Sequence, residues 1–564
     1  MGPIKALLAV TMVIAVQTLA VPAAVQSERV TIHVDASSSS RKMSPVWAWF
    51  GYDEPNYTYM KDGPKLLSEL AALSPTPVYV RAHNLLTSGD GRPALKWGST
   101  NAYTEDASGA PRYDWTIVDR ILDTYIERKM KPFLEIGFMP EALSSKPAPY
   151  KHDWAPGLDY NRIYTGWSYP PKDYDKWREL IYQLGRHVLQ RYGRSEVDSW
   201  VWEVWNEPDI GYWHGTPVEF QKLYDYAADG LKRALPNAAI GGPEVTGPNG
   251  QRTQQMLREF LEHCLRGTNF ATGKIGSPLD YITFHAKGSP RIVDGHVRMG
   301  ISNQLRAIDN GFRIVASFPE LKDRPIVLGE SDPEGCAACS VATNPENAYR
   351  NGTMYSSYTA AQVARTYELA DRHQVNLRGT VTWAFEFEDQ PYFAGFRDLA
   401  TNGLDKPVLN VFRMLGQMTG DRLAVKSSSA ASLDVIREAG VRDRPDVYAL
   451  AARTRDTMTV LIWNYHDDDV AGPAADIDLT IDGARDGQAT LTHARVDQDH
   501  SNSYEAWKKL GSPQQPTPAQ YAQLEKAGQL QLLGPPERVR VRNGTLKMAL
   551  SLPRQGVSLL KLAY

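Results

Sequence analysis

The apolar residues of this chain fall into eight short continuous runs between residues 46 and 385, separated by segments long enough for helices. Continuous apolar runs are typical of parallel strands that are buried on both faces, whereas a strand with one face in water alternates apolar and polar residues. The runs lie at residues 46–51, 78–80, 132–138, 200–204, 239–242, 281–285, 326–330 and 380–385. We therefore expect eight parallel strands in this part of the chain.

The segments between these runs carry apolar residues at helical spacing. Within residues 113–128, for example, Ile117, Ile121 and Tyr125 lie on one side of a helix. Similar patterns predict helices at residues 174–192, 217–235, 353–372 and 408–418. Alternating strands and helices predict the α/β class and, with eight units, a (β/α)8 TIM barrel over residues 42–421.

Beyond residue 422 the pattern changes to short runs rich in β-branched residues between turn signals. The runs lie at residues 447–452, 457–464, 477–481, 489–496, 538–541, 546–550 and 557–563. They predict a C-terminal antiparallel β-sandwich over residues 422–564. A polar helical insertion near residues 501–532 is expected to cap it, and an isolated N-terminal strand within residues 25–41 is expected to join it.

The first residues have the pattern of a secretory signal. Lys5 supplies a positive charge, residues 6–16 are apolar, and Ala23 is among the small residues that suit cleavage. Residues 1–24 are therefore expected to be a signal peptide, with an uncleaved anchor as the alternative. No later segment has about 18 uninterrupted apolar residues, so we expect no membrane span after cleavage and an exported protein, periplasmic or extracellular.

Charge and cysteine content narrow the possible partners. A net charge of −3 argues against nucleic acid as the main partner. Cys336 and Cys339 have the spacing of a zinc half-site or a redox pair, but no second pair or neighbouring histidines complete a metal site. We expect no metal and no cofactor, a local disulfide between these two residues, and a buried thiol at Cys264.

Two glutamates carry most of the predicted chemistry. Glu207 stands in the sequence Trp205-Asn206-Glu207-Pro208 directly after the fourth predicted strand, and Glu330 ends the seventh. Catalytic groups of a barrel lie at the carboxyl ends of its strands. Two carboxyl groups facing one sugar ring can act as acid/base and nucleophile of a glycoside hydrolase, with a raised pKa on the acid. The alternative is that each glutamate pairs with an arginine of the barrel.

Several stretches around these glutamates form a recognisable set. They lie at residues 80–83, 135–140, 191–193, 202–209, 241–243, 284–285 and 406–407. With them the chain resembles glycoside hydrolase family 39, which contains β-xylosidases and α-L-iduronidase. The resemblance implies Glu207 as acid/base and Glu330 as nucleophile. It also implies that His83, Asn206 and His285 hold the reacting sugar and that Trp383 forms its floor.

The substrate is harder to choose. Lys287 follows His285 in a pattern that resembles the iduronidase, whose lysine binds the carboxylate of a uronic acid, and Arg397 could supply a second cation. Alternatively, Lys287 neutralises a barrel carboxylate and Arg397 lies in a surface loop. Glu386 and Glu388 are expected near the mouth of the pocket, where they could bind sugar hydroxyls or repel an anionic substrate.

These patterns together predict an exported retaining glycosidase whose partner is an oligosaccharide or polysaccharide. The leading expectation is an exo-acting β-xylosidase that releases terminal xylose from xylo-oligosaccharides. An α-L-iduronidase-like exo-uronidase is the alternative, followed by an arabinosidase and by a non-catalytic carbohydrate-binding protein. The aromatic-rich loop at residues 140–171 is expected to form one wall of the pocket.

Overall fold

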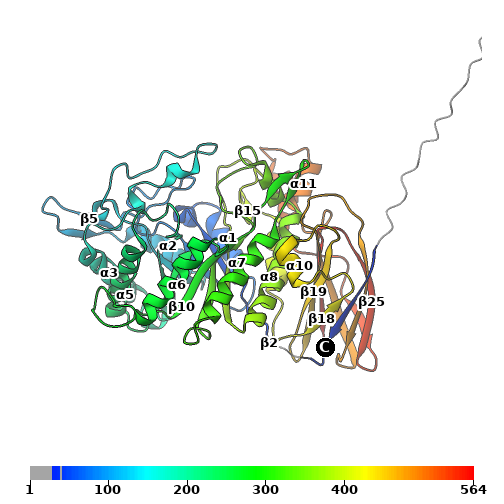
Figure 1. The fold of residues 1–564 in the computed structure, drawn as a ribbon. Coiled ribbons are helices and arrows are strands. Elements are labelled where there is room, and N and C mark those ends of the chain that lie inside the picture. Colours follow the sequence, from blue (N-terminus) through cyan, green and yellow to red (C-terminus); the bar gives the residue numbers. More distant parts are fainter. Residues whose placement is uncertain (1–27, 39–40) are drawn as a thin grey trace, which may run out of the picture.

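The computed structural model describes residues 28–38 and 41–564. The chain forms a barrel with a β-sandwich beside it (Figure 1). The expected signal peptide, residues 1–24, lies outside the described residues. Among the residues that are described, no helix is long and apolar enough to cross a membrane.

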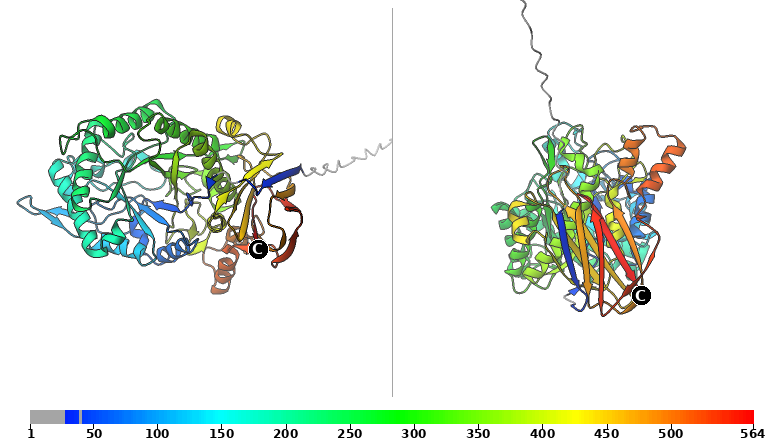
Figure 2. Two further views of the ribbon diagram at one scale, coloured as in Figure 1. Left: turned by 90° about the horizontal axis from the view of Figure 1, so that it is seen from below. Right: turned by 90° about the vertical axis from the view of Figure 1, so that its right-hand side faces the viewer.

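The predicted barrel is confirmed. Its strands are parallel and closed, because the last pairs with the first. Its strands are β3 (Trp49–Tyr52), β4 (Tyr79–Ala82), β7 (Lys131–Ile136), β8 (Val201–Val204), β9 (Ala239–Val245), β10 (Tyr281–Lys287), β13 (Pro325–Asp332) and β14 (Asn376–Trp383). Its helices are α1 (Gly63–Ala71), α2 (Thr116–Ile126), α3 (Tyr174–Tyr192), α5 (Pro217–Ala234), α6 (Gln251–Arg266), α7 (Ile301–Ala316), α8 (Thr353–His373) and α9 (Pro407–Leu415). The left view of Figure 2 shows these helices as a ring around the strands.

Local sequence fixes where the helices begin and end. The α5 helix starts with a capping box, in which Thr216 and Glu219 each accept a hydrogen bond from the other's backbone N–H, and Pro217 occupies its first turn. The α3 helix is capped by Asp173 and ends at Gly193, whose φ of 79° suits glycine. These signals set the first residue of α5 and both ends of α3.

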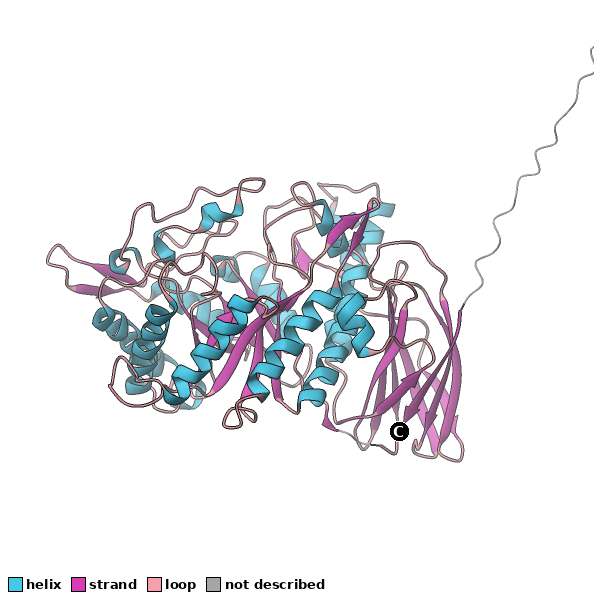
Figure 3. Ribbon diagram, in the orientation of Figure 1, coloured by secondary structure: helices cyan, strands magenta, loops and turns pink. Residues whose placement is uncertain are grey.

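The sandwich consists of two sheets packed on an apolar core. The smaller sheet has the order β18 (Ala424–Ser427), β1 (Glu28–Asp35), β21 (Ala475–Asp482) and β25 (Thr545–Leu552). The larger has the order β2 (Arg41–Lys42), β17 (Asp421–Arg422), β19 (Asp446–Arg453), β20 (Thr457–Tyr465), β26 (Val557–Ala563), β22 (Gly487–Val496) and β23 (Gln531–Leu532), and β24 (Glu537–Val541) pairs with β22. Figure 3 shows these strands at the right of the barrel.

The expectation of a purely antiparallel sandwich is wrong at one pairing. The β1 strand joins the sandwich as expected from its position, but it runs parallel to β21 and antiparallel to β18. A hairpin forces neighbouring strands to be antiparallel, whereas two strands joined by a long connection can be parallel. Here the whole barrel lies between β1 and β21 along the chain, so the parallel pairing is available.

The helical insertion does not cap the sandwich. It consists of α11 (Ser503–Lys509) and α12 (Pro518–Gly528). Trp507 and Leu524 pack with Phe393 and Leu404, which lie in the segment after the last barrel strand. The expected position was wrong because the apolar side chains of the insertion find their partners on the barrel.

Short elements complete the fold. These are hairpins β5–β6 (Tyr103–Glu105, Pro111–Tyr113), β11–β12 (Arg291–Val293, His296–Arg298) and β15–β16 (Ala400–Thr401, Leu404–Asp405), helices α4 (Arg194–Val197) and α10 (Leu433–Ala439), and the 3₁₀ turns Pro55–Tyr59, Glu141–Leu143, Tyr160–Ile163, Gly166–Ser168 and Pro345–Asn351. Three of these turns lie in the long connection between β7 and α3, which forms part of the site described next.

Candidate active site

A cavity of about 560 Å³ contains both glutamates. Its volume lies within the range of small-molecule sites, and it opens where the carboxyl ends of the barrel strands meet. Its walls are formed by Asp53, Lys96, Trp154, Gly157, Leu158, Tyr160, Tyr164, Glu207, Ile210, Tyr212, Lys287, Glu330, Gly335, Cys336, Cys339, Thr343, Asn344 and Trp383. Of the eight residues expected at the site, Glu207, Glu330, Lys287 and Trp383 line this cavity directly.

His285 brings the two glutamates together. Its Nδ1 lies 2.9 Å from Glu207 Oε1 and 4.0 Å from Glu330 Oε2. The backbone of the turn that carries Glu207 is strained, because Trp205 and Glu207 have φ angles of 72° and 43°. Non-glycine residues held at positive φ are often found at functional sites.

The two carboxyl groups have opposite protonation tendencies. Burial raises the pKa of Glu207, although its hydrogen bond with His285 opposes the shift. Burial also disfavours the ionised form of Glu330, but Lys287 and His285 lie close enough to hold the pKa of this carboxyl well below its usual range. Unequal surroundings therefore favour a protonated Glu207 beside an ionised Glu330.

Arg81 on β4 is a fully buried cation in the middle of the barrel. Its guanidinium lies 2.9 Å from Glu135 and 3.4 Å from Glu330, and it also pairs with Glu203. Burial raises the pKa values of Glu135 and Glu203 well above the ordinary value, so these two favour the neutral form. The alternative from sequence, that a glutamate pairs with a barrel arginine, is thus true of Glu330, which also lines the cavity.

His83 lies between Asp53 and Arg81 in a chain of buried polar contacts. Its Nδ1 lies 2.9 Å from Asp53, and its Nε2 lies 3.0 Å from the Arg81 guanidinium. Burial lowers the pKa of His83 to about 4, which favours a neutral ring that donates from Nδ1 to Asp53. The ammonium of Lys96 lies 2.5 Å from the same Asp53 carboxylate, so Asp53 joins a cavity lysine to the histidine.

Asn206 and Trp383 take different positions. Asn206 is buried; its side-chain oxygen accepts from Arg81 at 3.0 Å, and its amide nitrogen Nδ2 has no partner among the described residues. Trp383 ends β14 and lies with one ring edge against Gly51, where any larger residue would collide with the indole. The sequence expectation of an aromatic floor corresponds to a ring that lines the cavity.

Lys287 and Arg397 converge on a carboxylate of the protein. Asp332 Oδ1 lies 2.8 Å from Lys287 Nζ and 2.7 Å from Arg397 Nη1, and its other oxygen accepts from the backbone N–H of Trp383. Lys287 also lies 2.6 Å from Glu330. Arg397 is fully buried and does not line the cavity, so it is neither in a surface loop nor at the substrate surface.

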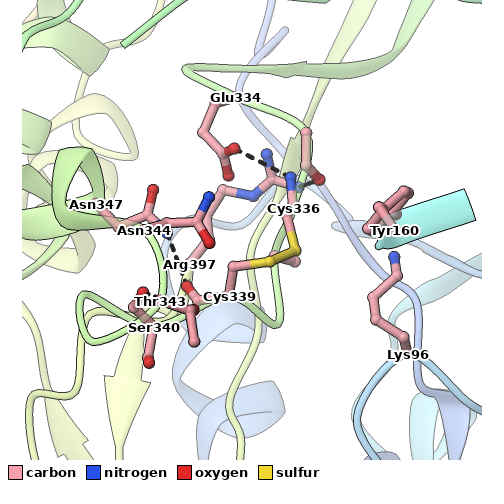
Figure 4. Close-up of a disulfide and its surroundings, with 12 residues drawn as sticks. Lys96, Tyr160, Glu334, Cys336, Cys339, Ser340, Thr343, Asn344, Asn347 and Arg397 are labelled. Carbon is pink, nitrogen blue, oxygen red and sulfur yellow. Dashed lines mark hydrogen bonds between the residues drawn. A yellow bond between two sulfur atoms is a disulfide. The ribbon is translucent and has the colours of Figure 1, made fainter. Parts of the chain in front are cut away.

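Two loops form the walls of the cavity. The predicted wall from residues 140–171 is confirmed through Trp154, Tyr160 and Tyr164, and the loop after β13 lies opposite. The second loop contains a disulfide between Cys336 and Cys339, as predicted. Figure 4 shows this disulfide with Tyr160 and Lys96 facing it.

The expectation for Glu386 and Glu388 is wrong. Glu388 accepts hydrogen bonds from the backbone N–H groups of residues 61–63 at the start of α1, and Glu386 accepts from that of Gly403. Neither side chain lines the cavity, so neither repels a substrate. The amino-terminal end of a helix attracts carboxylates, which explains the position of Glu388.

Cys264 is buried on α6, as expected.

Several residues of the site could not be predicted from the local sequence. Asp53, Lys96 and Asp332 are polar residues in loops or at a strand end, and their pairing depends on which loops meet in space. Arg81 and Glu135 lie within stretches that resemble the family, but nothing local reveals that they pair. Among the described residues, no group of three or more His, Cys, Asp or Glu side chains is arranged to hold a metal ion.

The curated relatives of this chain include β-xylosidases and α-L-iduronidases. A β-xylosidase of Caldicellulosiruptor saccharolyticus is 26% identical over 425 residues, covering 73% of this chain and 76% of the relative. A β-xylosidase of Geobacillus stearothermophilus is 24% identical and covers 86% of each chain. The α-L-iduronidase of Mus musculus is 27% identical over 540 residues, covering 90% of this chain and 77% of the relative.

Solved structures show the same fold. A bacterial orthologue of human α-L-iduronidase superposes with a TM-score of 0.73 at 21% identity, covering 95% of this chain and 84% of that chain. A monomeric β-xylosidase of Caulobacter crescentus CB15 gives a TM-score of 0.72 at 21% identity, with 94% and 99% covered. The sequence pattern of glycosyl hydrolases family 39 matches residues 30–533. The chain therefore belongs to glycoside hydrolase family 39, as its motifs indicated, and is a hydrolase of glycosidic bonds.

Proposed function

We propose that this chain is an exported, retaining, exo-acting β-xylosidase that releases terminal xylose from xylo-oligosaccharides. The observation that carries the proposal is that Glu207 and Glu330 share His285 while their pKa values move in opposite directions. A double displacement needs one protonated carboxyl group and one ionised carboxylate. The pair therefore supports both catalytic roles.

The proposed reaction has two steps. Glu207 donates its proton to the glycosidic oxygen while an oxygen of Glu330 attacks the anomeric carbon, and the bond to the leaving group breaks. Glu207, now ionised, then takes a proton from water, whose oxygen attacks the same carbon and frees Glu330. The distance between Glu207 Oε1 and Glu330 Oε2 cannot exceed the sum of their distances to His285. That limit is compatible with the ~5–5.5 Å of retaining enzymes and with only the shortest of the ~6.5–9.5 Å separations of inverting ones.

Exo action is supported by how closely the two cavity loops approach. A Cβ added at Gly157 would lie 3.8 Å from Thr343 Cγ2, which is ordinary van der Waals contact. Gly157 belongs to the loop after β7 and Thr343 to the loop after β13. A cavity bridged by its loops accommodates the end of a chain better than the middle of one.

Charge around the sugar favours xylose over a uronic acid. β-D-Xylose and α-L-iduronic acid share their ring configuration from C1 to C4, and the carboxylate on C5 distinguishes them. Lys287 forms ion pairs with Glu330 and Asp332, and Arg397 forms an ion pair with Asp332. Two cations matched by two carboxylates leave no net positive charge for a substrate carboxylate, which supports a neutral sugar.

An α-L-iduronidase-like exo-uronidase is the second candidate. Lys287 does line the cavity, and its ammonium would meet a C5 carboxylate if the contact with Asp332 were exchanged for one with substrate. The mouse iduronidase also matches 90% of this chain. Arabinoside hydrolysis and sugar binding without turnover have no comparable observation in their favour.

The two candidates are separated by a matched pair of aryl glycosides, a β-D-xyloside and an α-L-iduronide, with Glu330→Ala as the blank. Xyloside turnover that the blank lacks supports the first candidate, and iduronide turnover supports the second. Proton NMR of the first-formed product should show the β-anomer of xylose. The α-anomer would overturn the retaining mechanism, and turnover of neither sugar would overturn both candidates.

A further inference from the structure

Two large apolar side chains stand in water at the cavity. Leu158, in the loop between β7 and α3, is 48% exposed, and Ile210, in the turn after β8, is 38% exposed. Both line the same cavity as Glu207 and Glu330. Single exposed apolar residues need no explanation, but apolar residues gathered at a concave site indicate a binding surface.

Ile210 lies on the side of the cavity that holds Glu207, and the loop that contains Leu158 packs against the same turn. The backbone N–H of Ile210 donates to the Glu207 carbonyl oxygen at 3.2 Å, so both belong to one turn. Tyr164 connects this turn with the loop of Leu158, because its ring lies 5.2 Å from the ring of Tyr212 in the turn. The turn and the loop therefore form one continuous wall.

The inner part of the same cavity has a different character. Asp53, Lys96 and Lys287 present charged groups there, beside the ring of Trp383. Sugar hydroxyls can replace water at such groups, so the terminal sugar fits the inner part. The proton of Glu207 goes to the leaving-group oxygen, which places the leaving group on the Glu207 side.

We propose that Leu158 and Ile210, with the rings of Trp154 and Tyr164, form a binding site for an apolar aglycone. The enzyme then acts on glycosides of phenolic or other aromatic alcohols more efficiently than on the same sugar linked to a second sugar. This inference rests on the proposed function, since the role of Glu207 as acid decides which side the leaving group takes. Aliphatic side chains make no hydrogen bonds with sugar hydroxyls but do exclude water from an aromatic ring.

The test compares two substrates that share their sugar. One is the 4-methylumbelliferyl glycoside and the other the glycosyl fluoride, whose leaving group is too small to touch the wall. The double variant Leu158→Asn/Ile210→Asn should lose about 10-fold more kcat/KM on the umbelliferyl substrate than on the fluoride, the order of selectivity that small apolar contacts give. Ile275→Asn is the matched control, because Ile275 is 72% exposed and lies outside the cavity.

Equal losses on both substrates, or no loss on either, would overturn the proposed aglycone site. Failure of the proposed function looks different, since wild type would then hydrolyse neither xylosyl nor iduronosyl fluoride above the Glu330→Ala blank. In that case binding of free 4-methylumbelliferone, followed by its fluorescence, still decides the aglycone site. Weaker binding to the double variant than to Ile275→Asn supports the site, and equal binding refutes it.

Discussion

At the residue scale, the chemistry depends on which charges surround each carboxyl group. Glu207 and Glu330 are the same residue type and both contact His285, yet only Glu330 has Lys287 beside it. Burial raises the pKa of Glu207. Burial also lowers the pKa of His285, but the neighbouring carboxyl groups of Glu330 and Glu244 outweigh this and raise it to about 10. The ring of His285 therefore favours the imidazolium form at neutral pH and carries a positive charge between the two catalytic groups.

Replacing Glu207 by alanine should separate its acid role from binding. Activity on glycosides of poor leaving groups should fall by about 10²–10⁴-fold, the usual contribution of general acid catalysis, whereas the glycosyl fluoride should be cleaved almost as fast as by wild type. The measurement is kcat/KM for the two substrate types. Glu330→Ala is the control that should lose both activities, and a loss on the fluoride as large as on the poor substrate would show that Glu207 does something else.

Replacing His285 by glutamine should move the pH profile. The imidazolium lowers the pKa values of both Glu207 and Glu330, so its removal raises both. Activity needs Glu330 ionised and Glu207 protonated, so the acid limb of kcat/KM and the alkaline limb should both shift to higher pH. A profile unchanged in position, or shifted to lower pH, would contradict the electrostatic role given to His285.

Sequence reasoning could identify the residues at strand ends but not the partners that come from loops. Glu207 and Glu330 were predictable because apolar runs reveal strands and catalytic groups of a barrel lie where its strands end, whereas His285 was implied by the resemblance to the family. Lys96 and Asp53 pair across separate loops, and no pattern in either segment indicates the other. Arg397 was expected as a cation that contacts the substrate. Instead, its guanidinium pairs with the carboxylate of Asp332 at the end of β13.

At the element scale, a disulfide and the hydrogen bonds of a buried arginine stabilise the loop after β13 independently of each other. The Cys336–Cys339 disulfide closes a short loop of the chain. Arg350 is buried beneath it and donates to the carbonyl oxygens of Cys336, Ala337, Cys339 and Gly395. These contacts fix one wall of the cavity whether or not the sulfurs are joined.

Removing the disulfide should therefore leave the wall in place. Cys336→Ser/Cys339→Ser should cost roughly 2 kcal/mol of unfolding free energy, as expected for so short a loop, and should raise KM only slightly. Arg350→Met should cost more and should raise KM strongly, because it leaves several buried carbonyl oxygens without a donor. The measurements are urea unfolding and KM for an aryl glycoside, and a larger KM change in the cysteine variant than in Arg350→Met would reverse this assignment.

At the scale of the whole molecule, the barrel and the sandwich share a core. Side chains of β20 alternate, so that Leu461 and Trp463 join the barrel core while Val460 and Ile462 join the core between the two sheets. The α8 helix is buried along nearly its whole length between the barrel strands and this sheet. The run rich in β-branched residues at 457–464 predicted a strand, but only the assembled fold shows that both faces of β20 are covered.

The shared core predicts that a break at the junction destabilises the whole enzyme without touching its chemistry. Asp446 on β19 is fully buried and accepts from Arg365 of α8 at 2.8 Å and from Trp463 at 3.0 Å. Asp446→Ala should cost about 3 kcal/mol, since the buried Arg365 loses a buried carboxylate and keeps Glu368 and the carbonyl oxygen of Ala431 as partners.

Asp434→Ala is the matched control, because Asp434 pairs with Arg372 at 2.7 Å while its side chain is 60% exposed. An exposed pair of this kind contributes at most about 1 kcal/mol. Urea unfolding followed by tryptophan fluorescence and by residual activity should give one transition for both probes, shifted to lower urea in Asp446→Ala only, with kcat of the folded enzyme unchanged. Two separate transitions in wild type would contradict a shared core. They would mean that the barrel stays folded without the residues that the sandwich contributes to its core.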